Sequence, residues 1–355
     1  MRRLVDLGVR VLPALLAVAV ALGLAALLAA MGGHAPGRAV GALVDGSLGS
    51  AENVADVLVR ATPLVFTGVA VMLAFRSGIF NIGAEGQFLV GALAAGVVGT
   101  RWGSFPGQAV AALLAGMLAG AAWASLPALL RIRRGVSEVI TTILLNFVAL
   151  YLVSWAVNGP LQEASRTYPQ SDALAATSEL WQLAPSIDDR LHAGVVLALL
   201  LAVAAGALIS RTGLGLRLRA AGLNADAARM AGFPVIRDLA LAFALSGAIA
   251  GLGGAVELGG VTHRLFEKIS PGYGYTAIAV ALLGGLRVPG LVAAALFFAA
   301  LGAGATAMER SVGVSAVLAV AVQGATLLAV ATLGTPAVAR WIERRTGRRA
   351  GAEAS

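Results

Sequence analysis

Long apolar runs with few charges are the feature that most limits what this chain can fold into. An α-helix of about 20 apolar residues crosses the roughly 30 Å hydrocarbon core of a bilayer. The sequence therefore predicts an all-α, polytopic integral membrane protein with about ten transmembrane helices. The candidate runs lie near 11–31, 61–75, 82–100, 107–130, 138–157, 193–210, 238–256, 273–286, 289–308 and 314–333.

The composition excludes an ordinary soluble domain. Only 12% of the 355 residues are charged and 59% are hydrophobic, whereas soluble domains carry about 25% charged residues. The net charge of +8 does not point to nucleic acid, because basic residues beside transmembrane helices hold loops on the cytoplasmic side. The absence of Cys excludes disulfides and thiolate metal sites.

Two of the runs are short. The runs 61–75 and 273–286 adjoin Gly-rich polar patches, which predicts helices broken inside the membrane, so eight spans with two re-entrant segments are the alternative to ten. The run 11–31 is longer than a signal-peptide core, so we interpret it as a span. If the chain crosses the membrane ten times, eighteen of its 26 basic residues fall on the same side as both termini. Basic residues gather on the cytoplasmic side, so both termini are predicted to be cytoplasmic.

The loops predict a single transmembrane domain over 1–355 with two halves. The first half, 1–157, holds five spans, and the second half, 193–340, holds five more, with an outer loop at 158–192 between them. Halves with an odd number of spans must have opposite orientations, an arrangement found in transporters whose substrate route lies between inverted halves. A long cytoplasmic loop covers 211–237, and a basic cytoplasmic tail covers 341–355.

Polar side chains at membrane depth mark the segment that follows the second run. Asn81, Glu85 and Gln87 stand among glycines just before and inside the third run. A charge at the bilayer centre costs roughly 2.5–3.5 kcal/mol, so Glu85 is expected to face the protein interior, a partner or water. Two interpretations stay open: Asn81 and Glu85 cap the third helix, or the three side chains contact substrate.

A second polar stripe lies on the fifth run. Glu138, Thr142 and Asn146 recur every four residues and therefore share one helix face. That face is expected to pack on a neighbouring helix through hydrogen bonds or to line a hydrated route. Tyr273 opens the eighth run, where an interfacial aromatic anchor and a substrate contact are the two interpretations.

Small residues and helix signals give two further predictions. GxxxG spacing at Gly116 and Gly120, and at Gly247 and Gly251, predicts close helix packing. In the 211–237 loop, a short helix near 224–230 is expected to have Asn224 as its N-cap, Gly232 as its stop and Pro234 beyond it.

No catalytic or metal site is predicted. The three histidines are far apart and outside metal-ligand spacings, Ser246 lacks a GxSxG context, and the chain has no P-loop for ATP.

Four segments resemble one family. FNIGAEGQFLVGALAAG at 80–96 resembles the signature of permease subunits of bacterial ABC importers for nucleosides and simple sugars, and its FNIGAEGQ form favours the nucleoside branch. Further likenesses are VSEVITTILLNFVALYLVSWAVNGPL at 136–161, GLNADAARMAGF at 222–233 and GYGYTAIAVALLGGLRVPG at 272–290. Branched-chain amino acid permeases are more distant relatives in the same family.

The resemblance implies an importer of several subunits in the bacterial cytoplasmic membrane. Its partners would be a second permease subunit, cytoplasmic ABC ATPase subunits that hold ATP and Mg²⁺, and a substrate-binding lipoprotein or periplasmic protein; the permease itself would carry no cofactor. Gly222, Asn224, Ala228 and Gly232 would occupy the segment that couples to the ATPase. Asn81, Gln87 and Asn146 would hydrogen-bond a neutral solute during alternating access.

Two other functions are weighed against this one. A proton-coupled secondary transporter of a small polar solute would use Glu85 or Glu138 as proton carriers and would work without partners. A membrane enzyme would depend on Ser246 or on a histidine, and no residue spacing supports it.

Overall fold

The computed structural model describes residues 19–20, 22–27, 29–313 and 324. They form helices and no named strand, with isolated bridges only between Gln170 and Phe266 and between Gln182 and His192. The predicted all-α class is confirmed.

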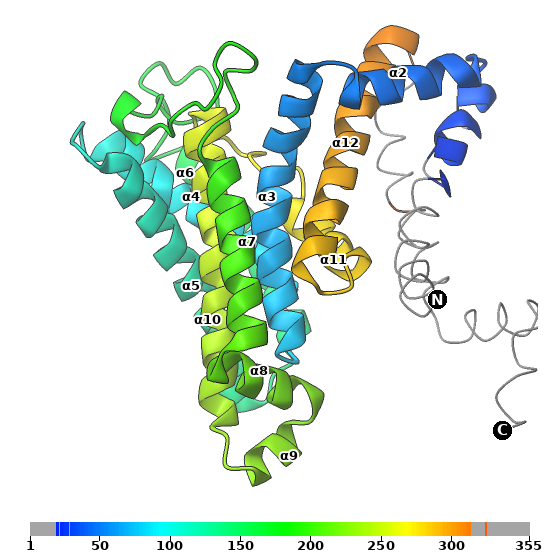
Figure 1. The fold of residues 1–355 in the computed structure, drawn as a ribbon. Coiled ribbons are helices and arrows are strands. Elements are labelled where there is room, and N and C mark those ends of the chain that lie inside the picture. Colours follow the sequence, from blue (N-terminus) through cyan, green and yellow to red (C-terminus); the bar gives the residue numbers. More distant parts are fainter. Residues whose placement is uncertain (1–18, 21, 28, 314–323, 325–355) are drawn as a thin grey trace, which may run out of the picture. The chain divides into compact units, whose positions relative to one another are not determined.

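The helices follow one another with short links, apart from one long segment between α6 and α7 (Figure 1). They are α2 (Pro36–Leu48), α3 (Ala51–Arg76), α4 (Ala84–Arg101), α5 (Gln108–Arg134), α6 (Glu138–Val157), the 3₁₀ turn η1 (Ala176–Ser178), α7 (Gly194–Arg211), α8 (Gly213–Leu223), α9 (Ala225–Met230), α10 (Val235–Glu257), the π-helical turn η2 (Leu258–Thr262), α11 (Tyr273–Leu283) and α12 (Val288–Val312).

Six of the described helices are long and apolar enough to cross a membrane: α3, α5, α6, α7, α10 with η2, and α12. The predicted total of about ten is not confirmed. The short helix predicted over 61–75 is wrong, because α3 begins ten residues earlier, at Ala51, and has 26 residues. The short run that begins at Tyr273 is confirmed as short, since α11 has 11 residues. Apart from residue 324, the predicted run 314–333 lies outside the described residues, as do the tail 341–355 and residues 11–18, 21 and 28 of the run 11–31.

The chain divides into two compact units, residues 1–54 with 300–355 and residues 55–299. In the first unit, α2 contacts the last turns of α12 so closely that a Cβ added to Gly304 would lie 2.3 Å from the Leu43 carbonyl oxygen. Ala29, Ala39 and Met308 form its buried cluster. The two inverted halves of five spans remain a prediction.

In the second unit, α4, α5 and α10 form a tightly packed trio. A Cβ added to Gly120 would lie 2.2 Å from the Gly247 carbonyl oxygen, and one added to Gly91 would lie 2.2 Å from that of Gly251. Real Cβ contacts are longer than 3.0 Å, so only glycine permits this approach. The close packing predicted from the GxxxG spacings is confirmed. α4 is buried along most of its length and lies at the centre of this unit.

The two ends of this unit differ. α8 and α9 lie at one end of the bundle, and the 158–192 segment covers the other (Figure 1).

Glu163 holds the 158–192 segment together. It accepts hydrogen bonds from Ser165 Oγ at 2.7 Å and from Gln170 Nε2 at 2.8 Å, and it pairs with Arg264. The Ser165 and Gln170 hydrogen bonds hold the pKa of Glu163 below its ordinary value.

His192 ends the same segment as a buried, neutral side chain. It is 1% exposed, and its Nδ1 accepts a hydrogen bond from the Gly194 backbone N–H at 3.0 Å. Burial, with a smaller contribution from the charge of His263, lowers the pKa of His192 to about 4. The imidazole is therefore uncharged at neutral pH and serves to pack this end of the bundle.

Candidate functional site

A closed hydrogen-bond network holds the first group of predicted site residues. Asn81 Nδ2 donates to Gln87 Oε1 at 3.0 Å and to Ser246 Oγ at 2.9 Å, while Asn81 Oδ1 accepts from Gln87 Nε2 at 3.1 Å and from the Gly83 backbone N–H at 2.9 Å. Ser246 Oγ donates to the Ala70 carbonyl oxygen at 2.8 Å. The three side chains are at most 1% exposed.

This network ties three elements together. Asn81 lies in the link between α3 and α4, Gln87 in α4 and Ser246 in α10. Both oxygen and nitrogen of the Asn81 amide are bonded within the protein, so in this conformation a substrate would have to displace those partners. The geometry supports a structural clamp, with Asn81 fixing the backbone just before α4. Ser246, considered only as a nucleophile from the sequence, is part of the clamp.

Glu85 lies between two helix starts. Its Oε2 accepts a hydrogen bond from the Gly274 backbone N–H at 2.7 Å, 189 residues away in the chain. A Cβ added to Gly274 would lie 2.2 Å from the Glu85 backbone nitrogen, so the first turns of α4 and α11 touch. Helix N-termini carry partial positive charge and stabilise an adjacent carboxylate. The Glu85 carboxyl group therefore lies beside the first turns of both α4 and α11. Its hydrogen bond goes to α11 and not to the free N–H groups of its own helix, α4.

The predicted stripe on α6 divides into two parts. Thr142 and Asn146 are at most 2% exposed. Asn146 Oδ1 accepts from the Gly86 backbone N–H at 2.8 Å, and its Nδ2 donates to the Ile82 carbonyl oxygen at 2.9 Å and to Tyr275 Oη at 3.3 Å. Glu138, at the start of α6, instead forms an ion pair with Arg131 of α5. The interhelical contact considered for Asn146 is present, joining α6 to the α4 start and α11.

Tyr273 contacts residues that the sequence reasoning did not single out. Its Oη donates to Glu257 Oε1 at 3.4 Å, and its ring lies 5.6 Å from that of Phe88 between centroids. Glu257 is 6% exposed and ends α10. The predicted run 238–256 stopped one residue before it, and an acid directly after such a run was the available signal. These contacts join the half-buried Tyr273 to the end of α10 and to α4.

The predicted coupling segment has the expected local structure. Asn224 Oδ1 accepts from the backbone N–H groups of Asp226 and Ala227, both at 3.0 Å, and so caps α9. Ala228 is buried, Gly232 has a φ of +82°, and α10 begins directly after Pro234. The predicted N-cap, stop and breaker are confirmed.

Gly222 joins this segment to the α3–α4 link. A Cβ added to Gly222 would lie 2.5 Å from the Arg76 carbonyl oxygen and 2.8 Å from the Gly78 backbone nitrogen. The end of α8 is thus in backbone contact with the link that begins after α3 and leads to Asn81. The tip of the segment carries Leu223 and Met230, each 90% exposed, which the sequence reasoning did not assign.

Five of the predicted site residues are therefore connected: Gly222 contacts the link that leads to Asn81, and Gln87, Glu85 and Asn146 lie around the start of α4. Glu138 is not among them. Among the described residues, no group of three or more His, Asp or Glu side chains is placed to hold a metal ion.

Comparison with known proteins identifies the family. The sequence pattern of the family described as branched-chain amino acid transport system / permease component matches residues 53–331. The chain belongs to this permease family. It is a multi-pass membrane protein and a transport subunit, not itself catalytic, and the ABC importers to which this family contributes also contain ATPase and binding-protein subunits.

Several curated relatives of the permease have names that state a solute. It is 39% identical to a glucose ABC transporter permease protein of Haloferax volcanii over 84% of its own length and 80% of that protein. It is 36% identical to a guanosine ABC transporter permease protein of Bacillus subtilis, over 84% and 86% of the two chains. A nucleoside ABC transporter permease protein of Lactococcus lactis is 32% identical over 74% and 75%. No solved structure matches the chain.

Proposed function

We propose that this permease imports nucleosides, with simple sugars as the alternative substrate class. The relatives named for guanosine and for nucleosides, at 36% and 32% identity, support the first class, and the relative named for glucose, at 39%, supports the second. The FNIGAEGQ segment at 80–87 resembles the form of the nucleoside branch and so favours nucleosides.

The observation that carries the proposed mechanism is the contact between Gly222 and the α3–α4 link. An ATPase docked at the exposed tip formed by Leu223 and Met230 has a direct mechanical path to Asn81 and, through it, to α4 and α10. Apolar side chains that are 90% exposed at the tip suit a protein contact. Closure of the ATPase subunits on ATP then shifts the link and exchanges the outward and inward openings of the permease.

The proposed assembly has this permease beside a second permease subunit, homologous or identical, with ATP and Mg²⁺ held only by the ATPase subunits. Substrate arrives from a lipoprotein or periplasmic binding protein over the 158–192 end. Both termini and the α8–α9 end face the cytoplasm of a bacterial cell. The spans, about ten in number, are arranged in two inverted halves.

Uptake by the complete importer in proteoliposomes tests the proposal. Labelled guanosine, uridine, glucose and ribose are offered with the binding protein outside and ATP on the ATPase side. We expect ATP-dependent uptake of the nucleosides and none with the permease alone under a proton gradient. Uptake of sugars without nucleosides would assign the sugar class, and accumulation by the permease alone would refute ATPase coupling.

A further inference from the structure

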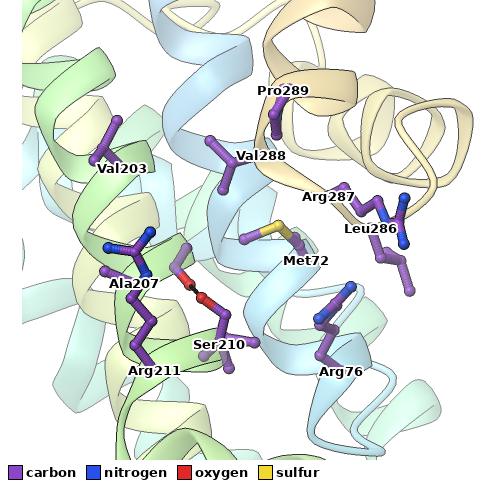
Figure 2. Close-up of a pocket in the computed structure, with 12 residues that line it drawn as sticks. Met72, Arg76, Val203, Ala207, Ser210, Arg211, Leu286, Arg287, Val288 and Pro289 are labelled. Atoms are coloured by element: carbon purple, nitrogen blue, oxygen red, sulfur yellow. Dashed lines mark hydrogen bonds between the residues drawn. The ribbon is translucent and has the colours of Figure 1, made fainter.

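A cleft with three arginines opens at the α8–α9 end of the second unit. It has a volume of about 560 Å³ and lies between the last turns of α3, the last turns of α7 and the link that leads into α12 (Figure 2). This volume is within the roughly 300–1,000 Å³ of small-molecule sites. Its wall is apolar, and the side chains that form most of it are Met72, Val203, Ile209, Leu286, Val288 and Pro289.

The charges at its edge share one sign. In Figure 2, Arg76 and Arg287 lie on one side of the cleft and Arg211 lies on the other. The charge of Arg219 also acts on Arg76. None of these four arginines forms an ion pair with an acid of the described residues, whereas Arg131, Arg217 and Arg229 at the same end each do. Like charges gathered without an acid favour the binding of an anion.

The position of the arginines suits the membrane surface. Arg76 and Arg211 are the last residues of the membrane-spanning helices α3 and α7. Arginines at span ends lie at the level of lipid headgroups, and the apolar wall next to them lies at the level of the acyl chains. Basic pockets between spans near such an end bind acidic lipid headgroups. A neutral nucleoside or sugar carries no negative charge for three guanidinium groups to bind, so this cleft does not suit the proposed substrates.

We propose that this cleft binds one anionic phospholipid of the phosphatidylglycerol class. Arg76, Arg211 and Arg287 bond the phosphate oxygens, and an acyl chain lies against Met72 and Val203. The Ser210 hydroxyl donates to the Gly206 carbonyl oxygen at 2.6 Å within α7, so the guanidinium groups provide the principal donors. The site joins α3 to α7 and to the link before α12.

Native mass spectrometry of the purified importer tests this site. Phosphatidylglycerol or phosphatidylcholine is titrated into detergent micelles, and retained lipid is counted. The test variant carries Arg76→Gln, Arg211→Gln and Arg287→Gln. The matched control carries Arg133→Gln, Arg134→Gln and Arg237→Gln, which remove three exposed arginines from the same end that have no ion pair among the described residues. Arg287→Gln alone, on the exposed link, is the second variant if the triple one fails to assemble.

We expect the parent protein and the control to retain one phosphatidylglycerol at least tenfold more tightly than the triple variant, with a smaller loss for Arg287→Gln alone. Phosphatidylcholine is expected not to compete. Equal retention by the triple variant and the control would refute the site. Displacement of the lipid by inorganic phosphate alone would show a soluble-anion site and would equally overturn the proposal.

Discussion

Replacing Gly222 by alanine tests the coupling path most directly. The new Cβ would lie 2.5 Å from the Arg76 carbonyl oxygen, and an ordinary contact begins at 3.4 Å, so the two backbones must separate by about 0.9 Å. The atoms it meets are all backbone, so no side-chain rotation relieves the overlap. Overpacking of this kind costs about 1–3 kcal/mol, and separation also breaks the direct contact between the end of α8 and the α3–α4 link.

We expect Gly222→Ala to reduce ATP-driven uptake severely while the importer still assembles and hydrolyses ATP. Uptake and ATP hydrolysis are measured together in proteoliposomes, so that loss of coupling is seen as hydrolysis without transport. Gly213→Ala is the matched control, because Gly213 also lies in α8 and has open space around its Cβ position. Equal uptake by Gly222→Ala, Gly213→Ala and the parent protein would refute the path through the link.

Three further predictions concern stability and charge. Asn81→Leu is expected to lower the melting temperature, because leaving the buried Gln87 amide without its hydrogen-bond partner costs about 1–3 kcal/mol of stability. An unchanged melting temperature with a raised KM for uptake would instead indicate a substrate contact. The pKa of His192 is about 4 in the folded protein and 6.5 in the unfolded chain, so as the pH falls the unfolded chain takes up a proton first. The free energy of unfolding therefore falls by about 3 kcal/mol between pH 6.5 and pH 4. His192→Asn should remove this dependence, which is measured as a flatter plot of melting temperature against pH. Glu85→Gln keeps an acceptor for the Gly274 N–H but removes the charge, so it should cost about 0.5–2 kcal/mol in unfolding experiments yet retain ATP-driven uptake, whereas a proton carrier would lose uptake.

The sequence predicted features that depend on nearby residues. Asn224, Gly232 and Pro234 define α9 because capping and chain reversal are decided within a few residues. Close helix packing at Gly120 and Gly247 also followed from residue type and spacing. The family signature at 80–96 located the segment that the structure places at the centre of the polar network.

Features that depend on distant residues were not predictable in the same way. The partner of Glu85 is Gly274, and no local pattern indicates that the starts of α4 and α11 touch. The early start of α3 was missed because its first turns hold charged residues, among them Asp56 and Arg60, which pair at 2.7 Å one turn apart. A hydropathy criterion ends a helix at such residues, whereas the backbone continues through them.

Contact between α4, α5 and α10 through bare backbone limits how the protein can change shape. The closest contacts between these helices involve backbone atoms and the methyl groups of Ala124 and Ala255, which have no rotamers to change, so the trio is expected to move as a rigid body. Spin labels on any two of its members should report the same separation with and without ATP. Hinges must then be sought at the margins of the trio, and chemical cross-links within it should leave turnover intact.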